Sequence, residues 1–158
     1  MLSPLMLWPL VLGLLGSAHA VPGTGQIGNS LPKAPPTIVE LVQDLSGNDA
    51  PKQLLAARDL QHQTRIADRM TGAGGDSLWA LEARAELAEL TRHALPACLD
   101  KLQMRRVGPP CADLAGRLEE PVACAPLAAA VATSPNWANR HAAARALRRL
   151  GAVCLATP

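Results

Sequence analysis

The sequence predicts an all-α protein. The chain of 158 residues is 49% hydrophobic, yet it contains no Phe, no Tyr and only three Trp. Its apolar residues are mostly Ala and Leu, which lose little side-chain freedom in a helix, as do Arg and Glu. The aromatic and β-branched side chains that pack well on sheets are scarce. We therefore expect a small antiparallel helical bundle or a set of stacked helical hairpins, with disulfides in the C-terminal half.

The first twenty residues predict an export signal. An apolar run from Leu5 to Leu15 is followed by Ala18-His19-Ala20, which places small residues where a signal peptidase requires them. The run is too short to span a bilayer. We expect residues 1–20 to be a signal peptide, and the mature chain to be secreted and extracellular, with no transmembrane segment.

The segment after residue 20 is rich in proline and glycine, and it is followed by residues that typically begin helices. Residues 21–36 offer little to bury, which predicts a disordered leader before a single helical domain over 37–158. Thr37 and Glu40 form a capping-box pattern, so a first helix is expected at about 37–45. Pro51 suits the first turn of a second helix, which runs to about residue 70.

A third helix, beginning after Asp76 or Ser77, has the clearest helical pattern. Its small and large apolar residues recur on one face, and we expect this seam, including its tryptophan, to be buried: Trp79, Ala83, Leu87, Leu90 and Ala94. Prolines then predict four shorter helices at about 96–106, 110–120, 122–133 and 135–150. Short connections favour antiparallel neighbours.

All four cysteines lie in the second half of the chain, at Cys98, Cys111, Cys124 and Cys154. An even number in an exported chain predicts two disulfides. Zinc is not favoured, because no Cys-x-x-Cys or His-x-x-x-His spacing occurs. Alternating helix directions favour the pairs Cys98–Cys124 and Cys111–Cys154. The alternative is pairing between neighbours, Cys98–Cys111 and Cys124–Cys154.

The net charge of +2 is too small to indicate a nucleic-acid partner. No acidic residue follows Glu120, however, and the predicted last helix carries Arg140, Arg145, Arg148 and Arg149. These arginines are a candidate site for weak binding of a polyanion such as heparan sulfate, or of an anionic membrane surface. An ordinary solvated helix face would have the same pattern.

Two dibasic pairs, Arg105-Arg106 and Arg148-Arg149, are candidate processing sites for a protease of the convertase type. The simpler explanation is that both pairs end predicted helices, where Arg complements the helix dipole. If either pair is cleaved, the chain would be a prohormone-like precursor.

Catalytic motifs are absent from the sequence. The G-x-G-x-x-G pattern at 23–28 lacks the flanking strand and helix of a dinucleotide site. His62, His93 and His141 lie among charged residues typical of solvated helix faces, and no Gly-x-Ser-x-Gly occurs. We therefore expect neither enzymatic activity nor a cofactor or metal.

These observations favour a secreted, non-enzymatic helical protein that acts through protein–protein binding. The expected partner is another protein or a receptor. The chain resembles a cytokine in size, export and disulfide count only, since it has no motif of a cytokine family. Two alternatives are a precursor cleaved at the dibasic sites and an extracellular accessory protein that binds glycans or membranes.

Overall fold

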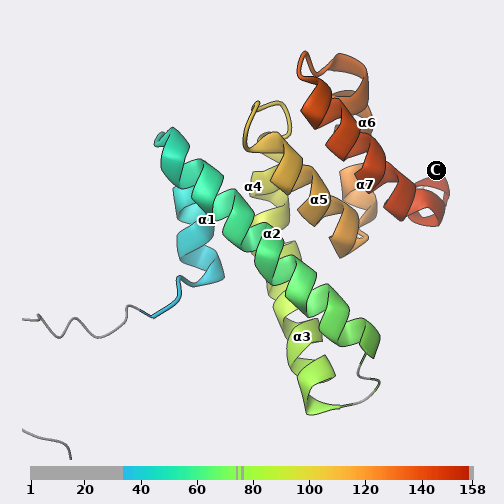
Figure 1. Ribbon diagram of the computed structural model, residues 1–158. Helices are drawn as coiled ribbons and strands as arrows, with labels where there is room; N and C mark the ends of the chain where they lie inside the picture. The colour runs from blue at the N-terminus through green and yellow to red at the C-terminus, as the bar shows by residue number, and fades with distance from the viewer. Residues whose placement is uncertain (1–33, 74, 76, 157–158) are drawn as a thin grey trace, which may run out of the picture. The chain divides into compact units, whose positions relative to one another are not determined.

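The computed structural model describes residues 34–156 except 74 and 76, and all regular structure within them is helical, without strands (Figure 1). This confirms the predicted all-α class. The expected signal peptide, the leader up to residue 33 and the glycine pattern at 23–28 lie outside the described residues. The elements, in chain order, are α1 (Ile38–Ser46), α2 (Ala50–Ala73), α3 (Leu78–Glu89), a π-helical turn (Leu90–Ala94), α4 (Leu95–Asp100), α5 (Gly108–Leu118), a 3₁₀ turn (Pro121–Ala123), α6 (Cys124–Thr133) and α7 (Trp137–Leu155).

Local capping fixes where the first helices begin. The Thr37 hydroxyl accepts the Glu40 N–H at 3.3 Å, and the Glu40 carboxylate accepts the Thr37 N–H at 2.8 Å, which confirms the capping box. The apolar face of α1 buries Leu41 and Leu45 where it packs against α2. In α2, Pro51 lies in the first turn, where its missing N–H leaves no hydrogen bond unmade.

Helices α2 and α3 run in opposite directions and pack closely through alanine (Figure 1). Ala67 of α2 and Ala80 and Ala83 of α3 are buried at this contact. Trp79 lies about 100° around the helix from Ala80, and its side chain is 66% exposed. The prediction that Trp79 belongs to the core was therefore wrong, because the close approach of the two helices leaves room only for small side chains.

The helical path continues from α3 through Pro96 into α4. In the π-helical turn the Leu95 N–H bonds to the Leu90 carbonyl, five residues back. This wider turn accommodates Pro96, which has no N–H to donate. A separate helix at 96–106 was therefore an incorrect prediction: the helix already under way ends at Asp100, and residues 101–107 form turns. We call residues 101–107 the rim loop.

Helix α5 contacts α2, α4 and α7, and its middle is buried. Gly116 lies directly against Ala146 of α7. A Cβ placed on this glycine would come within 2.8 Å of the Ala146 Cβ, closer than real carbon atoms pack. The chain therefore needs a residue without a side chain here for α5 and α7 to reach their observed contact.

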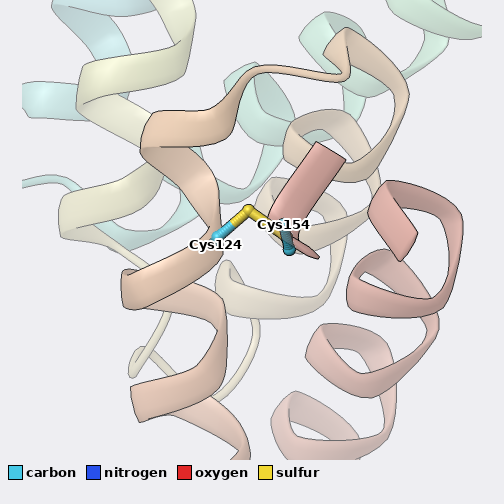
Figure 2. Close-up of a disulfide and its surroundings, with 2 residues drawn as sticks. All are labelled: Cys124 and Cys154. Atoms are coloured by element: carbon cyan, nitrogen blue, oxygen red, sulfur yellow. A yellow bond between two sulfur atoms is a disulfide. The ribbon is translucent and has the colours of Figure 1, made fainter. Parts of the chain in front are cut away.

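One disulfide joins the beginning of α6 to the end of α7, between Cys124 and Cys154, with 5.6 Å between their Cα atoms (Figure 2). The favoured pairing of Cys98 with Cys124 and Cys111 with Cys154 was therefore wrong. It treated residues 96–106 as a helix of reversed direction, whereas α4 continues α3. Cys98 and Cys111 are free thiols in this structure, and both are fully buried.

Candidate binding cleft

An arginine-lined cleft opens where α2, the rim loop, the beginning of α5 and α7 come together. Its volume is about 430 Å³. The cleft contains three arginines from three different parts of the chain together with uncharged side chains, and its lining is Leu54, Arg58, Gln61, Arg106, Pro109, Pro110 and Arg145. We call this the arginine cleft.

The arginine cleft continues into a hollow of about 510 Å³ with a mainly apolar lining, which we call the apolar groove. Leu54 and Arg106 line both hollows. The remaining lining comes from the beginning of α2 and from the rim loop: Ala50, Pro51, Leu55, Met104, Arg105 and Val107. Leu55 is 60% exposed and adds accessible apolar surface to the groove.

The side chains of the three cleft arginines are exposed and form none of the polar contacts that hold the described helices together. Within the described part of the chain, Arg58, Arg106 and Arg145 make no hydrogen bond or ion pair with another residue. Arg105, on the groove side of the rim loop, is exposed as well. The charge of the cleft is therefore positive and available to a ligand.

The rim loop is anchored to α7 through its backbone. The buried Asn139 side chain donates to the carbonyls of Leu102 and Met104, at 2.9 and 3.2 Å. Asn136 donates to the Arg105 carbonyl at 3.1 Å. These bonds hold the loop that carries two arginines, so the rim of the cleft is formed before any ligand binds.

Glycine at position 108 is required for this anchoring. A Cβ on Gly108 would collide with the Leu102 carbonyl oxygen and would lie 2.8 Å from the Asn139 amide nitrogen. Any larger residue would push the rim loop away from α7.

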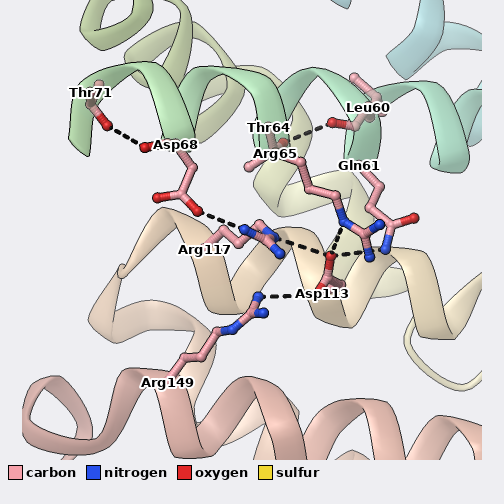
Figure 3. A network of polar contacts seen from close by, with 9 residues as sticks. All are labelled: Leu60, Gln61, Thr64, Arg65, Asp68, Thr71, Asp113, Arg117 and Arg149. Carbon is pink, nitrogen blue, oxygen red and sulfur yellow. Dashed lines mark hydrogen bonds and ion pairs between the residues drawn. The ribbon is translucent and has the colours of Figure 1, made fainter. Parts of the chain in front are cut away.

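Beside the cleft, Asp113 of α5 forms a polar network that joins α2, α5 and α7 (Figure 3). Its carboxylate accepts hydrogen bonds from Gln61 at 2.9 Å, Arg65 at 2.9 Å, Arg117 at 3.2 Å and Arg149 at 3.0 Å. Burial alone would raise the pKa of Asp113, but the bonds from Gln61, Arg65 and Arg117 outweigh it and lower the pKa to about 2. The carboxylate is therefore ionised at neutral pH and holds the cleft walls together.

The four arginines predicted as a polyanion site lie in different surroundings in the structure. Arg149 is paired with Asp113, and Arg140 donates to the Ser134 carbonyl at 2.7 Å. Arg145 lines the cleft, and Arg148 is exposed without a hydrogen-bond partner among the described residues. The charge of this helix is therefore divided between structural contacts and the cleft.

The two dibasic pairs also lie in different environments. Arg105 and Arg106 belong to the rim loop, outside any helix, and both side chains are exposed. Arg148 and Arg149 lie inside α7. The sequence indicated other roles for Arg106 and Arg145 and gave no signal for Arg58, because no local pattern links an arginine of α2 to one of α7.

The three histidines examined in the sequence lie outside both hollows. His93 contacts Glu89 at 3.2 Å, His141 lies beside Trp137, and His62 is exposed on α2. Within residues 34–156, apart from 74 and 76, no three His, Cys, Asp or Glu side chains are grouped to hold a metal ion. Over the same part of the chain, no helix has the length and hydropathy needed to cross a membrane.

No protein-family model, curated protein or solved structure matches this chain.

Proposed function

We propose that the protein is a secreted, non-enzymatic binding protein that uses the arginine cleft and the apolar groove to bind an acidic, partly apolar segment of a partner protein. In this proposal the helices form an antiparallel bundle of stacked hairpins, and the rim loop presents the site. The observation that carries the proposal is the junction of three unpaired arginines with an apolar groove, at residues shared by both hollows.

The apolar groove and the arginine cleft would each contribute a different part of the binding free energy. An apolar side chain the size of Leu buried in the groove would contribute about 1.5–3 kcal/mol. Carboxylates facing Arg58, Arg106 and Arg145 would contribute less each, because the arginines are exposed, but would increase the association rate and orient the segment.

The chemistry of the lining supports binding over catalysis. The side chains around both hollows are arginine, glutamine, proline, alanine and other aliphatic groups. Arginine keeps its proton at physiological pH, so it holds anions but does not exchange protons with them. Charge complementarity therefore favours an anionic partner.

Anchoring of the rim loop also favours binding over processing at Arg105-Arg106. A protease needs the chain extended across its active site, whereas the Arg105 carbonyl here is bonded to Asn136. We expect the folded protein to resist cleavage at this pair.

The test begins with selection of displayed random peptides on the purified mature protein. We expect selected peptides to place Asp or Glu next to a large apolar residue. Their dissociation constants are then measured for two variants of equal charge. The cleft variant is Arg58→Ala/Arg106→Ala/Arg145→Ala. The control variant removes three arginines outside the cleft, Arg69→Ala/Arg92→Ala/Arg148→Ala.

The cleft variant should bind about tenfold more weakly, since three exposed ion pairs of about 0.5 kcal/mol each sum to about 1.5 kcal/mol. The control variant should bind like the wild type. Leu55→Asp should abolish binding, whereas the same substitution at Leu81, which is also exposed but lies on α3, should not. Equal weakening of both arginine variants would contradict a specific site. If no peptide is selected, and both arginine variants are retained more weakly than the wild type on a heparin column to the same extent, the protein binds polyanions in general instead.

A further inference from the structure

The two free thiols, Cys98 and Cys111, belong to the same hydrophobic core and precede and follow the rim loop in the sequence. Cys98 is in the last turn of α4 and Cys111 is near the beginning of α5, so the two residues lie at the two ends of the connection between these packed helices. Both side chains are fully buried in the same hydrophobic core, and the Cys111 thiol is near enough to raise the pKa of the Cys98 thiol. No other cysteine is available to either of them, because Cys124 and Cys154 are already bonded.

We propose that Cys98 and Cys111 are oxidised to a second disulfide during export, and that this bond fastens the rim loop. The bond rests on the export that is part of the proposed function, but it does not depend on the binding site. Its effect on the loop does concern that site, because Met104, Arg105 and Arg106 lie between the two cysteines.

The reaction requires a disulfide oxidant, either a protein disulfide or oxidised glutathione. One cysteine thiolate attacks the oxidant's disulfide and releases one oxidant thiol, leaving a mixed disulfide. The second cysteine thiolate then displaces the other oxidant thiol and forms the Cys98–Cys111 bond. The two cysteines lose two protons and two electrons, and the oxidant's disulfide becomes two thiols.

The two cysteines must be oxidised before folding buries them in the core. Interaction with Cys111, together with burial, raises the pKa of the Cys98 thiol well above its usual range, so the folded Cys98 thiol reacts slowly. An oxidant also cannot reach two fully buried sulfur atoms. Folding without an oxidant therefore leaves Cys98 and Cys111 as thiols, whereas folding in an oxidising compartment allows the Cys98–Cys111 disulfide to form.

Peptide mapping tests the bond directly. The full chain is obtained both from the medium of secreting eukaryotic cells and by refolding from denaturant in reduced and oxidised glutathione. Remaining thiols are alkylated under denaturing, non-reducing conditions before trypsin digestion. The expected result is peptide 93–101 linked to 107–117, with 118–140 linked to 150–158. Alkylated Cys98 and Cys111 in glutathione-refolded protein, or a link from either to Cys124 or Cys154, would overturn the proposal.

A second measurement tests whether the bond fastens the loop. In limited trypsin digestion, the Cys98→Ala/Cys111→Ala variant should be cut within the rim loop at least tenfold faster than the wild type. Cutting after Arg69 should be unchanged. The matched variant Cys124→Ala/Cys154→Ala removes the other bond and should leave the rate in the rim loop unchanged. Equal rim-loop rates in all three proteins would show that the cysteine pair does not hold the loop, even with the bond present.

Discussion

Replacing Asp113 with Asn removes the charge at the centre of the network while keeping the size of the side chain. Asp113 is 14% exposed and accepts bonds from α2, α5 and α7, so its ionised form is stabilised only in the folded protein. Its pKa falls from 3.8 to about 2 on folding. At full strength this shift corresponds to about 2.4 kcal/mol. The side chains of Arg65 and Arg149 are 44% and 45% exposed, so solvent screens part of the interaction, and we expect about 1–2 kcal/mol.

The sign of the pH dependence follows from the lowered pKa of Asp113. The stabilisation is fully present above the unfolded pKa of 3.8 and is lost as the pH falls through the folded pKa of about 2. The free energy of unfolding, measured by urea denaturation and circular dichroism, should therefore differ by about 1–2 kcal/mol between wild type and Asp113→Asn at pH 7. The difference should shrink between pH 4 and pH 2.

Asp59→Asn is the matched control, because Asp59 is exposed on α2 and has no hydrogen bond or ion pair within the described residues. It should change the free energy of unfolding by less than about 0.5 kcal/mol. A difference between wild type and Asp113→Asn that stays constant from pH 7 to pH 2 would refute the electrostatic explanation. It would indicate instead that the substitution disturbs packing.

Three further predictions concern the packing of the helices and the anchoring of the rim loop. Trp79→Ala should lower the free energy of unfolding by less than about 1 kcal/mol, because the ring is exposed. Leu90→Ala, at a fully buried position, should lower it by about 2–5 kcal/mol. Similar losses for the two variants would place Trp79 in the core. Gly116→Ala should destabilise by about 1–3 kcal/mol through collision with α7, while Gly72→Ala, with open space around it, should be neutral or stabilising in urea denaturation. Asn139→Ala should speed trypsin cleavage in the rim loop by freeing two carbonyls, and an unchanged rate would show that the loop is held by other contacts.

The sequence predicted elements whose signals are local. The capping box at Thr37 and Glu40 lies within four residues, and Pro51 suits a first turn by its own geometry. Pro96 misled the prediction, because a proline can begin a helix or be accommodated by a π-helical turn in a continuing one. That single error reversed the expected directions of the following helices and with them the favoured cysteine pairing.

The cleft could not be predicted because its parts are distant in the sequence. Arg58 and Arg145 meet only after α2, α5 and α7 have packed. The basic character of the last helix was visible, but which of its arginines are used by the fold depends on Asp113 and on the Ser134 carbonyl. In the same way, exposure of Trp79 follows from how closely α3 approaches α2, which the spacing of apolar residues does not determine.

The most direct test of the binding proposal is hydrogen–deuterium exchange of the protein with and without a selected acidic, apolar peptide. The proposal predicts that the peptide slows exchange in the rim loop and in the first three turns of α2, where Leu54, Leu55 and Arg58 lie. Exchange in α3, around the exposed Trp79, should not change. Slower exchange confined to α3, or spread evenly over the helices with none in the rim loop, would contradict the proposal.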